Sequence, residues 1–316
     1  MTPAARGRTA EPPAPAVGLV VAAHGRHVMV ETPEGRRVLC QTRGKKSDLV
    51  VGDHVRWQVT GDGGVIDGLA PRRNLLFRQD EWRTKSFAAN LDQLLVLVAP
   101  EPVFSESQLT RALIAAAEAG IPAVIGLNKT DLTTVAVARE RLAPYRAMGV
   151  DVIELALKTD PAGALTVLGP LLAGRTTLVL GPSGMGKSTL INLLVPQAAA
   201  QVGEISQALN TGRHTTTSTR WYWLDGPAAD AAHAARGALI DSPGFQEFGL
   251  RQVQPEQLAG LMPDYAAALG RCRFHNCSHR HEPGCGVREA AARGEISPTR
   301  QRIYAELYEE LSQKKW

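Results

Sequence analysis

The chain has 316 residues, of which 44% are hydrophobic and 21% are charged, and its formal net charge is +4. This length suggests two or three domains, and the composition is that of a soluble globular protein. No run of 18 apolar residues occurs, which excludes a transmembrane helix and leaves a cytoplasmic monomer without membrane contacts as the expectation.

Charge is unevenly distributed along the chain. The formal net charge is +5 over residues 1–90, −4 over residues 91–270 and +3 over residues 271–316. Basic ends suit a polyanionic partner such as nucleic acid, although excesses this small are also typical of solvated surface charge.

Residues 1–16 form an N-terminal segment rich in alanine, proline and arginine. The segment lacks the apolar core of a secretory signal, and we predict a disordered tail. A mitochondrial presequence is the alternative, but Glu11 and the prolines would interrupt its amphipathic helix.

Residues 17–75 contain short candidate strands separated by glycine-rich turn signals. The strands are predicted over Gly18–Ala23, His27–Glu31, Arg37–Gln41, His54–Val59 and Gly64–Asp67. This spacing predicts an RNA-binding barrel of the OB kind, while another small β-barrel remains open. The basic stretch from Arg72 to Lys85 is interpreted as a linker that contacts phosphates.

Residues 76–262 alternate between apolar strands and helices. Strands are predicted over Leu94–Ala99, Ala123–Leu127, Val152–Leu157 and Thr176–Leu180, and helices over Gln108–Ala119 and Arg139–Met148. This alternation predicts an α/β domain with a doubly wound sheet. The aromatic run Trp221–Trp223 is predicted to belong to a hairpin core rather than to a base-stacking platform.

The tetrapeptide Asn128-Lys129-Thr130-Asp131 follows one of the buried strands and matches the pattern NKxD. A carboxylate at Asp131 can accept hydrogen bonds from the N1–H and N2–H₂ of guanine, a donor pair that adenine lacks. Alone, the segment is more often a turn after a strand, but beside a phosphate-binding loop it predicts guanine selection.

A phosphate-binding loop (P-loop) follows the strand that ends at Leu180 and opens a helix predicted over Ser188–Leu194. Its pattern GxxxxGK[ST] is made by Gly181, Pro182, Ser183, Gly184, Met185, Gly186, Lys187 and Ser188, followed by Thr189. Strand and helix are the context that this motif requires. We expect its backbone N–H groups to bind phosphates, Lys187 to bridge the β- and γ-phosphates and Ser188 to bind Mg²⁺.

Asp241-Ser242-Pro243-Gly244 follows an apolar stretch and matches DxxG. We expect Asp241 to hold Mg²⁺, directly or through water, and the N–H of Gly244 to contact the γ-phosphate. A threonine-rich loop, Gly212–Ser218, lies between the P-loop and DxxG, where a threonine should bind Mg²⁺ when GTP is present. Thr216 and Thr217 are favoured for this role.

The order of these motifs is permuted, because NKxD precedes the P-loop, whereas in ordinary GTPases it follows. A parallel sheet tolerates such a cut since its strands keep their neighbours. DxxG then ends the GTPase domain and runs directly into the cysteine-rich segment. A movement of DxxG would therefore pull on that segment.

Phe245 stands where ordinary GTPases carry the glutamine that orients the attacking water. A phenyl ring cannot orient water, so Gln246, another group or a partner must supply this function. Our hypothesis is that His214 on the threonine-rich loop is the substitute. Unchanged hydrolysis by His214→Ala in the activated state would refute it.

Residues 263–316 contain a cysteine-rich segment and a final helix that starts at Ser297-Pro298. Cys272, Cys277 and Cys285 are clustered there with three histidines between them, His275, His279 and His281. In a reducing cytosol such clustering indicates a metal rather than disulfides. Three thiolates and one imidazole make a closed, structural zinc site, and the spacing leaves the choice of histidine open.

These motifs together closely resemble the RsgA (YjeQ) family of circularly permuted GTPases that depend on the small ribosomal subunit. The resemblance spans roughly residues 17–312 and rests on NKTD at 128–131, GPSGMGKST at 181–189, GRHTTT at 212–217, DSPG at 241–244 and the cysteine cluster. It implies an N-terminal OB barrel, a permuted P-loop GTPase domain and a C-terminal zinc-binding helical module. It also implies His279 as the fourth zinc ligand.

The resemblance further implies GTP hydrolysis stimulated by the 30S subunit, contacts with its rRNA, and a role in late 30S maturation in the cytoplasm. One departure concerns the loop that backs the guanine, here residues 155–159. The family has a serine followed by a small residue, whereas Ala156 lacks the hydroxyl, and we expect at most a modest loss of GTP affinity.

Two other function classes remain open. A non-enzymatic RNA-binding factor that senses GDP or GTP is disfavoured by Lys187, Ser188 and Asp241, although Phe245 leaves room for it. A P-loop kinase or ATPase is opposed by NKxD, and nucleotide competition distinguishes it.

Overall fold

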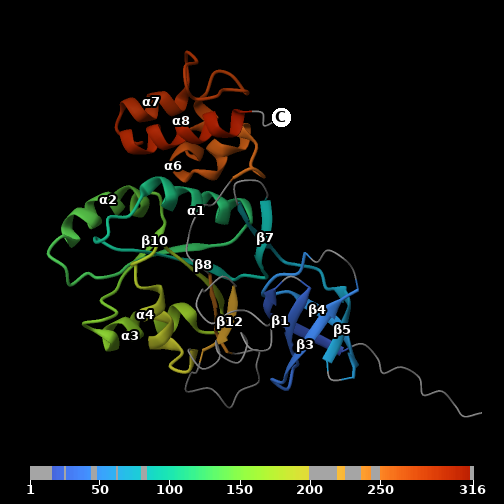
Figure 1. Ribbon diagram of the computed structural model, residues 1–316. Coiled ribbons are helices and arrows are strands. Elements are labelled where there is room, and N and C mark those ends of the chain that lie inside the picture. The colour runs from blue at the N-terminus through green and yellow to red at the C-terminus, as the bar shows by residue number, and fades with distance from the viewer. Residues whose placement is uncertain are drawn as a thin grey trace, which may run out of the picture.

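A computed structural model describes residues 16–24, 26–43, 48–61, 63–79, 84–198, 219–224, 236–242 and 250–313. In these residues an N-terminal β-barrel lies beside a central α/β domain, and a C-terminal helical module lies against the helices on one face of that domain (Figure 1). No helix within these ranges is long and apolar enough to cross a membrane.

The N-terminal barrel is closed by five strands. They are β1 (Ala16–His24), β2 (His27–Glu31), β3 (Arg37–Thr42), β4 (His54–Thr60) and β5 (Gly63–Leu69). The pairing runs β1-β2-β3-β5-β4 and returns from β4 to β1, with β3 and β5 parallel, which is an OB-type barrel. Alternate side chains point inward, and Val20, Val30 and Trp57 are buried in its core.

Cys40 belongs to the same barrel core and is fully buried. Burial raises the pKa of its thiol to about 11, so the thiol is neutral and packs as a small apolar group. Cys40 therefore has a structural role separate from the other three cysteines.

The stretch after the barrel is a hairpin rather than the linker interpreted from the sequence. Strands β6 (Leu75–Gln79) and β7 (Thr84–Ala89) pair antiparallel. Arg72, just before β6, donates from Nε to Asp53 Oδ1 at 2.7 Å and from Nη2 to Oδ2 at 2.8 Å. Because Asp53 is completely buried, this arginine pairs with a carboxylate of the barrel and has a structural role there.

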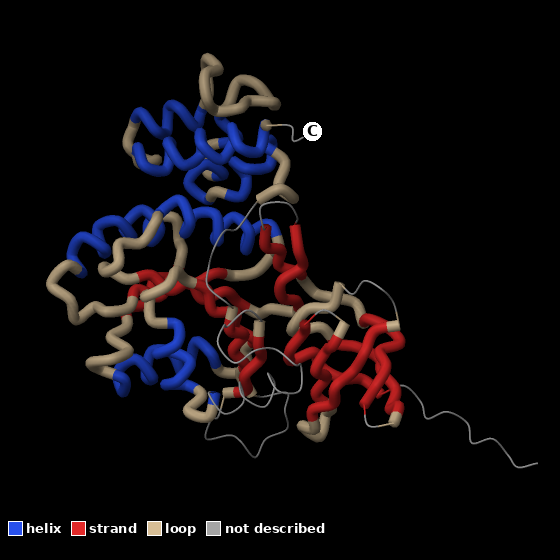
Figure 2. The backbone as a smooth tube through the Cα atoms, viewed as in Figure 1, coloured by secondary structure: helices blue, strands red, loops and turns tan. Residues whose placement is uncertain are grey.

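The central sheet has the order β10-β9-β8-β11-β13-β12. Figure 2 shows the strands in red. Its strands are β8 (Gln93–Val98), β9 (Ala123–Leu127), β10 (Asp151–Glu154), β11 (Thr176–Leu180), β12 (Arg220–Trp223) and β13 (Ala238–Asp241). All pair in parallel except β12, which is antiparallel to β13. The chain runs from β8 to β9 and β10 and then returns to β11 beside β8. In open α/β sheets ligands bind at the carboxyl ends of the strands where the order reverses in this way.

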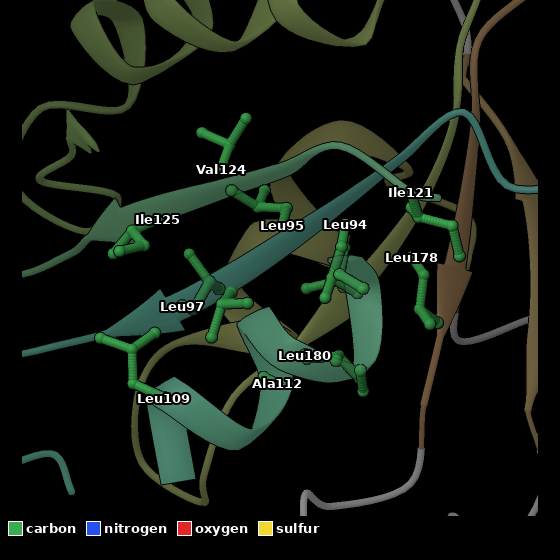
Figure 3. Packing of buried hydrophobic residues seen from close by; sticks show 14 of the residues in the cluster. Leu94, Leu95, Leu97, Leu109, Ala112, Ile121, Val124, Ile125, Leu178 and Leu180 are labelled. Carbon is green, nitrogen blue, oxygen red and sulfur yellow. The ribbon is translucent and has the colours of Figure 1, made fainter. Parts of the chain in front are cut away.

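Helices cover both faces of this sheet. Helices α1 (Glu106–Glu118) and α2 (Val135–Ala147) lie on one face, and α3 (Pro161–Leu172) and α4 (Lys187–Leu194) on the other (Figure 1). The interior is built from continuous apolar strands, and Figure 3 shows side chains of β8, β9, β11 and α1 in one cluster. Burial on both faces explains why β8 is buried at every position.

The C-terminal module consists of short helices around the cysteine cluster. They are η2 (Pro255–Leu261), α6 (Pro263–Ala266), η3 (Leu269–Arg271), α7 (Gly286–Ala292) and α8 (Pro298–Ser312). The predicted start of the last helix is confirmed, because the hydroxyl of Ser297 accepts a hydrogen bond from the backbone N–H of Arg300.

A buried arginine anchors this module on the central domain. Arg300 of α8 is 3% exposed and bonds both carboxylate oxygens of Asp264, at 2.9 and 2.8 Å. Its Nη1 donates to the hydroxyl of Thr110 on α1 at 2.8 Å, and the Thr110 hydroxyl also contacts the Tyr145 hydroxyl of α2. The buried ion pair with Asp264 lies within the module and fixes the Arg300 side chain, and the hydrogen bond to Thr110 links the module to α1.

Candidate functional site

The predicted nucleotide-binding segments meet at the carboxyl edge of the central sheet. The P-loop leaves β11, the NKxD segment leaves β9, and residues 155–159 leave β10. The strand order places these exits near one another, where the order of the strands reverses at β8 and β11.

The P-loop has the backbone conformation that its glycines permit. Gly181 has a φ of 152° and Gly186 a φ of 106°, both in the region that side chains avoid. A Cβ at Gly186 would lie 2.2 Å from the side-chain nitrogen of Asn128, and one at Gly181 would lie 2.6 Å from a backbone oxygen of Leu97. These two positions therefore require glycine, and α4 starts directly after them with its N–H groups facing the loop.

Lys187 is folded back over this loop. Its ammonium donates to the backbone oxygens of Gly181 and Pro182, the latter at 3.1 Å. Burial lowers the pKa of Lys187, and the nearby charge of Asp241 opposes this shift. The lysine thus lies where an anion cradled by the loop could replace the carbonyl oxygens as its partner.

Asp241 is the last residue of β13, the strand next to β11. Burial raises the pKa of its carboxyl to about 6, and the charges of Lys187 and Arg220 limit the rise. A partly buried carboxylate beside a P-loop with a serine at the helix start offers the oxygen ligands that a magnesium ion prefers.

Asn128 joins the three segments into one unit. Its side-chain nitrogen donates to the backbone oxygen of Met185 in the P-loop at 2.8 Å. Its side-chain oxygen accepts from the backbone N–H of Leu157 at 3.2 Å, which fixes the loop at residues 155–159. This geometry is consistent with the sequence prediction that the three segments form one site.

The rest of the NKxD segment is held from both sides. Lys129 has a φ of 60° and donates from Nζ to the backbone oxygen of Glu101 at 2.6 Å. Thr130 contacts the backbone oxygen of Leu155 through its hydroxyl, at 3.2 Å. Asp131 is exposed, so its carboxylate is accessible to a base.

Several predicted residues lie outside the described residues. They are His214, Thr216, Thr217 and Gly244, together with Phe245 and Gln246. Their roles stay predictions.

Two residues beside the site were not identified from the sequence. Glu101, in the loop after β8, provides the oxygen that holds Lys129. Arg220 of β12 is only 4% exposed and lies opposite Asp241 in the antiparallel pair. Opposite residues share a face of the sheet, so the charge of Arg220 acts on Asp241, and only the pairing of β12 with β13 could have revealed it.

The C-terminal module contains a second candidate site. One ligand atom from each of Cys272, Cys277, His279 and Cys285 lies within 4.8 Å of every other. Nδ1 of His279 is 3.5 Å from the sulfurs of both Cys272 and Cys285. Among the three candidate histidines, the structure thus selects His279, the one implied by the resemblance, and the donor set fits zinc.

The surrounding shell orients these ligands. The backbone N–H of Arg288 contacts the sulfur of Cys285, which caps α7. Burial lowers the pKa of His279, which keeps its imidazole in the neutral form that binds metals. Burial also raises the pKa of Cys277 to about 12, a cost that a bound cation would offset.

Comparisons with known proteins agree with the fold and with the family that the motifs resemble. The family model described as RsgA GTPase matches residues 69–251. A relative from Variovorax paradoxus named small ribosomal subunit biogenesis GTPase RsgA is 59% identical over 304 residues, 95% of this chain and 93% of its own.

Two solved structures share the fold over nearly the whole chain. YjeQ from Thermotoga maritima has a TM-score of 0.71 and 29% identity, covering 95% of this chain and 99% of its own. YloQ, described as a circularly permuted GTPase, has a TM-score of 0.68 and 23% identity, covering 98% of this chain and 100% of its own. With its motif order, its fold and these relatives, the chain belongs to the RsgA GTPase family.

Proposed function

We propose that this chain hydrolyses GTP to GDP and phosphate and acts in late maturation of the 30S ribosomal subunit. The main support is the arrangement around Asn128, which ties the P-loop to the NKxD segment and to the loop at 155–159. The name of the Variovorax relative, a small ribosomal subunit biogenesis GTPase, supports the same assignment.

The guanine base is recognised by the NKxD segment. Asp131 accepts the N1–H and N2–H₂ of guanine, and the stem of Lys129, held by Glu101, lies beside the base. The backbone around Ala156 supplies the remaining base contacts without a hydroxyl.

The phosphates are bound by the P-loop backbone, by Lys187 and by the start of α4 with Ser188 and Thr189. Ser188, Asp241 and a threonine at 216 or 217 provide oxygen ligands for Mg²⁺. When bound, Mg²⁺ neutralises charge that develops on the β- and γ-phosphates. Gly244 contacts the γ-phosphate through its N–H, and His214 orients the attacking water.

The barrel has a binding role and the C-terminal module a structural role. The barrel contacts rRNA, and the module around Cys272, Cys277, His279 and Cys285 holds one structural zinc ion. The protein acts as a monomer on the 30S subunit in the cytoplasm. Residues 1–90 carry a formal net charge of +5 and would contact the phosphates of rRNA. Binding to the subunit should therefore weaken as the salt concentration is raised.

The substitution Asp131→Asn tests the assignment of the base. An amide donates where the carboxylate accepts, so the variant should lose affinity for GDP by about tenfold or more and gain affinity for xanthosine diphosphate. Competition against a fluorescent nucleotide measures both affinities. The matched control is Asp151→Asn, which changes an exposed carboxylate at the start of β10, the end away from the nucleotide site. Unchanged guanine selectivity in Asp131→Asn refutes the proposal.

A further inference from the structure

One row of paired residues connects the barrel to the nucleotide site. Ala22 of β1 pairs with Arg220 of β12, Arg220 pairs with Asp241 of β13, and Asp241 pairs with Val179 of β11. The barrel is therefore a continuation of the central sheet, and β1 lies beside β12 (Figure 1).

Strand β12 depends on neighbours on both of its sides. It has four residues, and all four pair with β13. On its other side a single residue pair joins it to β1. A strand of four residues forms few backbone hydrogen bonds, so side-chain contacts between β12 and the barrel add to the stability of its position.

Those contacts are concentrated in a joint formed by Glu31, Arg37 and Trp223. Glu31 of the barrel is 5% exposed, and its Oε1 accepts the indole N–H of Trp223 on β12. Its Oε2 accepts from Nε of Arg37 at 2.9 Å. A buried carboxylate is costly unless it is hydrogen-bonded, so both partners are needed, and one of them comes from the central domain.

The ring of Trp223 is itself fixed from the central domain. It lies edge-on to Trp221, with 5.2 Å between ring centroids. The guanidinium of Arg236, just before β13, lies 5.9 Å from the Trp223 ring centroid. Trp223 thus connects Glu31 of the barrel to β12 and, through Arg236, to the start of β13.

We propose that Glu31 and Trp223 are positioning residues for the nucleotide site, through which the barrel holds β12 and thereby Asp241 in the arrangement that binds Mg²⁺ and the γ-phosphate. The inference rests on the proposed function. It requires that loosening the joint affects the magnesium and γ-phosphate side of the site, while the NKxD segment, which β11 and β8 separate from β13, keeps its contacts with the base.

The matched variants are Trp223→Phe and Trp221→Phe in the full chain. Both remove an indole from the same strand, but the indole N–H of Trp221 has no hydrogen-bond partner among the described residues. Trp223→Phe should weaken binding of a non-hydrolysable GTP analogue with Mg²⁺ by about three- to tenfold, since it removes a bond to a charged acceptor. GDP binding without Mg²⁺ should stay within about twofold of wild type, and Trp221→Phe should show no such split.

Two further variants keep the test decisive if Trp223→Phe is unstable. Glu31→Gln retains an acceptor for the indole, so its split between the two nucleotides should be smaller than that of Glu31→Ala. The effects of Glu31→Ala and Trp223→Phe should not add, because both break the same contact.

The inference is overturned if the joint variants match Trp221→Phe, or if they weaken GDP and the GTP analogue equally, as a purely structural contact would. A wild-type protein that binds no guanine nucleotide overturns the proposed function itself. Normal binding by wild type with no split in the variants overturns the joint alone.

Discussion

Replacing Lys187 by alanine is expected to lower the rate of GTP hydrolysis by about 10²–10³-fold, the typical cost of losing one group that stabilises transition-state charge. The ammonium now bonds the loop's own carbonyl oxygens, so it is already placed over the cradle that phosphates would occupy. Its partial burial strengthens any interaction with developing negative charge, because water screens it less.

Single-turnover hydrolysis at saturating GTP separates this effect from weaker binding. Lys85→Ala removes an exposed ammonium from strand β7 and serves as the control, with a rate expected within about twofold of wild type. A Lys187→Ala rate within about threefold of wild type would contradict the assignment of the P-loop as the catalytic phosphate site.

The second large effect is expected at the cysteine cluster. Cys285→Ser should abolish stoichiometric zinc binding and unfold the module around it, because structural zinc contributes about 10–16 kcal/mol of apparent binding free energy in small zinc domains. Cys285 is both a proposed zinc ligand and the cap of α7, so its loss should affect the metal and the helix together.

Metal content by mass spectrometry and limited proteolysis of residues 250–313 measure the two consequences. Cys40→Ala is the control, because Cys40 lies in the barrel core far from the cluster in sequence, and it should retain one zinc per chain. The zinc assignment fails if wild-type protein purified without chelators holds no zinc, or if Cys285→Ser holds as much as wild type.

The anchoring of the module by Arg300 changes how a switch movement would be transmitted. The sequence suggests that DxxG pulls directly on the cysteine-rich segment. In the structure that segment is also bonded to α1, through Arg300 with Thr110 and through Arg111 with Glu310. A movement beyond Asp241 would therefore act against a module already fixed to the central domain.

Local patterns predicted the elements that carry strong local signals. The strands His27–Glu31, Ala123–Leu127 and Thr176–Leu180 have the predicted bounds, because apolar runs and flanking turn residues mark them. Helix α3 was not predicted, and its second half contains Gly169 and Pro170, two residues that disfavour a helix interior. Its start was nevertheless signalled by Asp160, which caps the helix, and by Pro161 at the first position.

Contacts between distant segments could not be predicted in the same way. The motifs identified the P-loop and NKxD segments, but the bond from Asn128 to Met185 depends on the order of β9, β8 and β11. From the sequence Arg72 is a basic residue of an exposed stretch, and its ion pair with the buried Asp53 is known only from the fold. The spacing of the cysteines likewise left the histidine open; the family resemblance implied His279, and the structure places it beside the three cysteines.

The most direct test of the account is GTP hydrolysis by the purified full-length protein, measured alone and with added 30S subunits. The account predicts slow hydrolysis alone and a large stimulation by the subunits, lost in Lys187→Ala. Tight GTP binding with no stimulation would contradict it and would indicate a nucleotide sensor rather than an enzyme triggered by the ribosome.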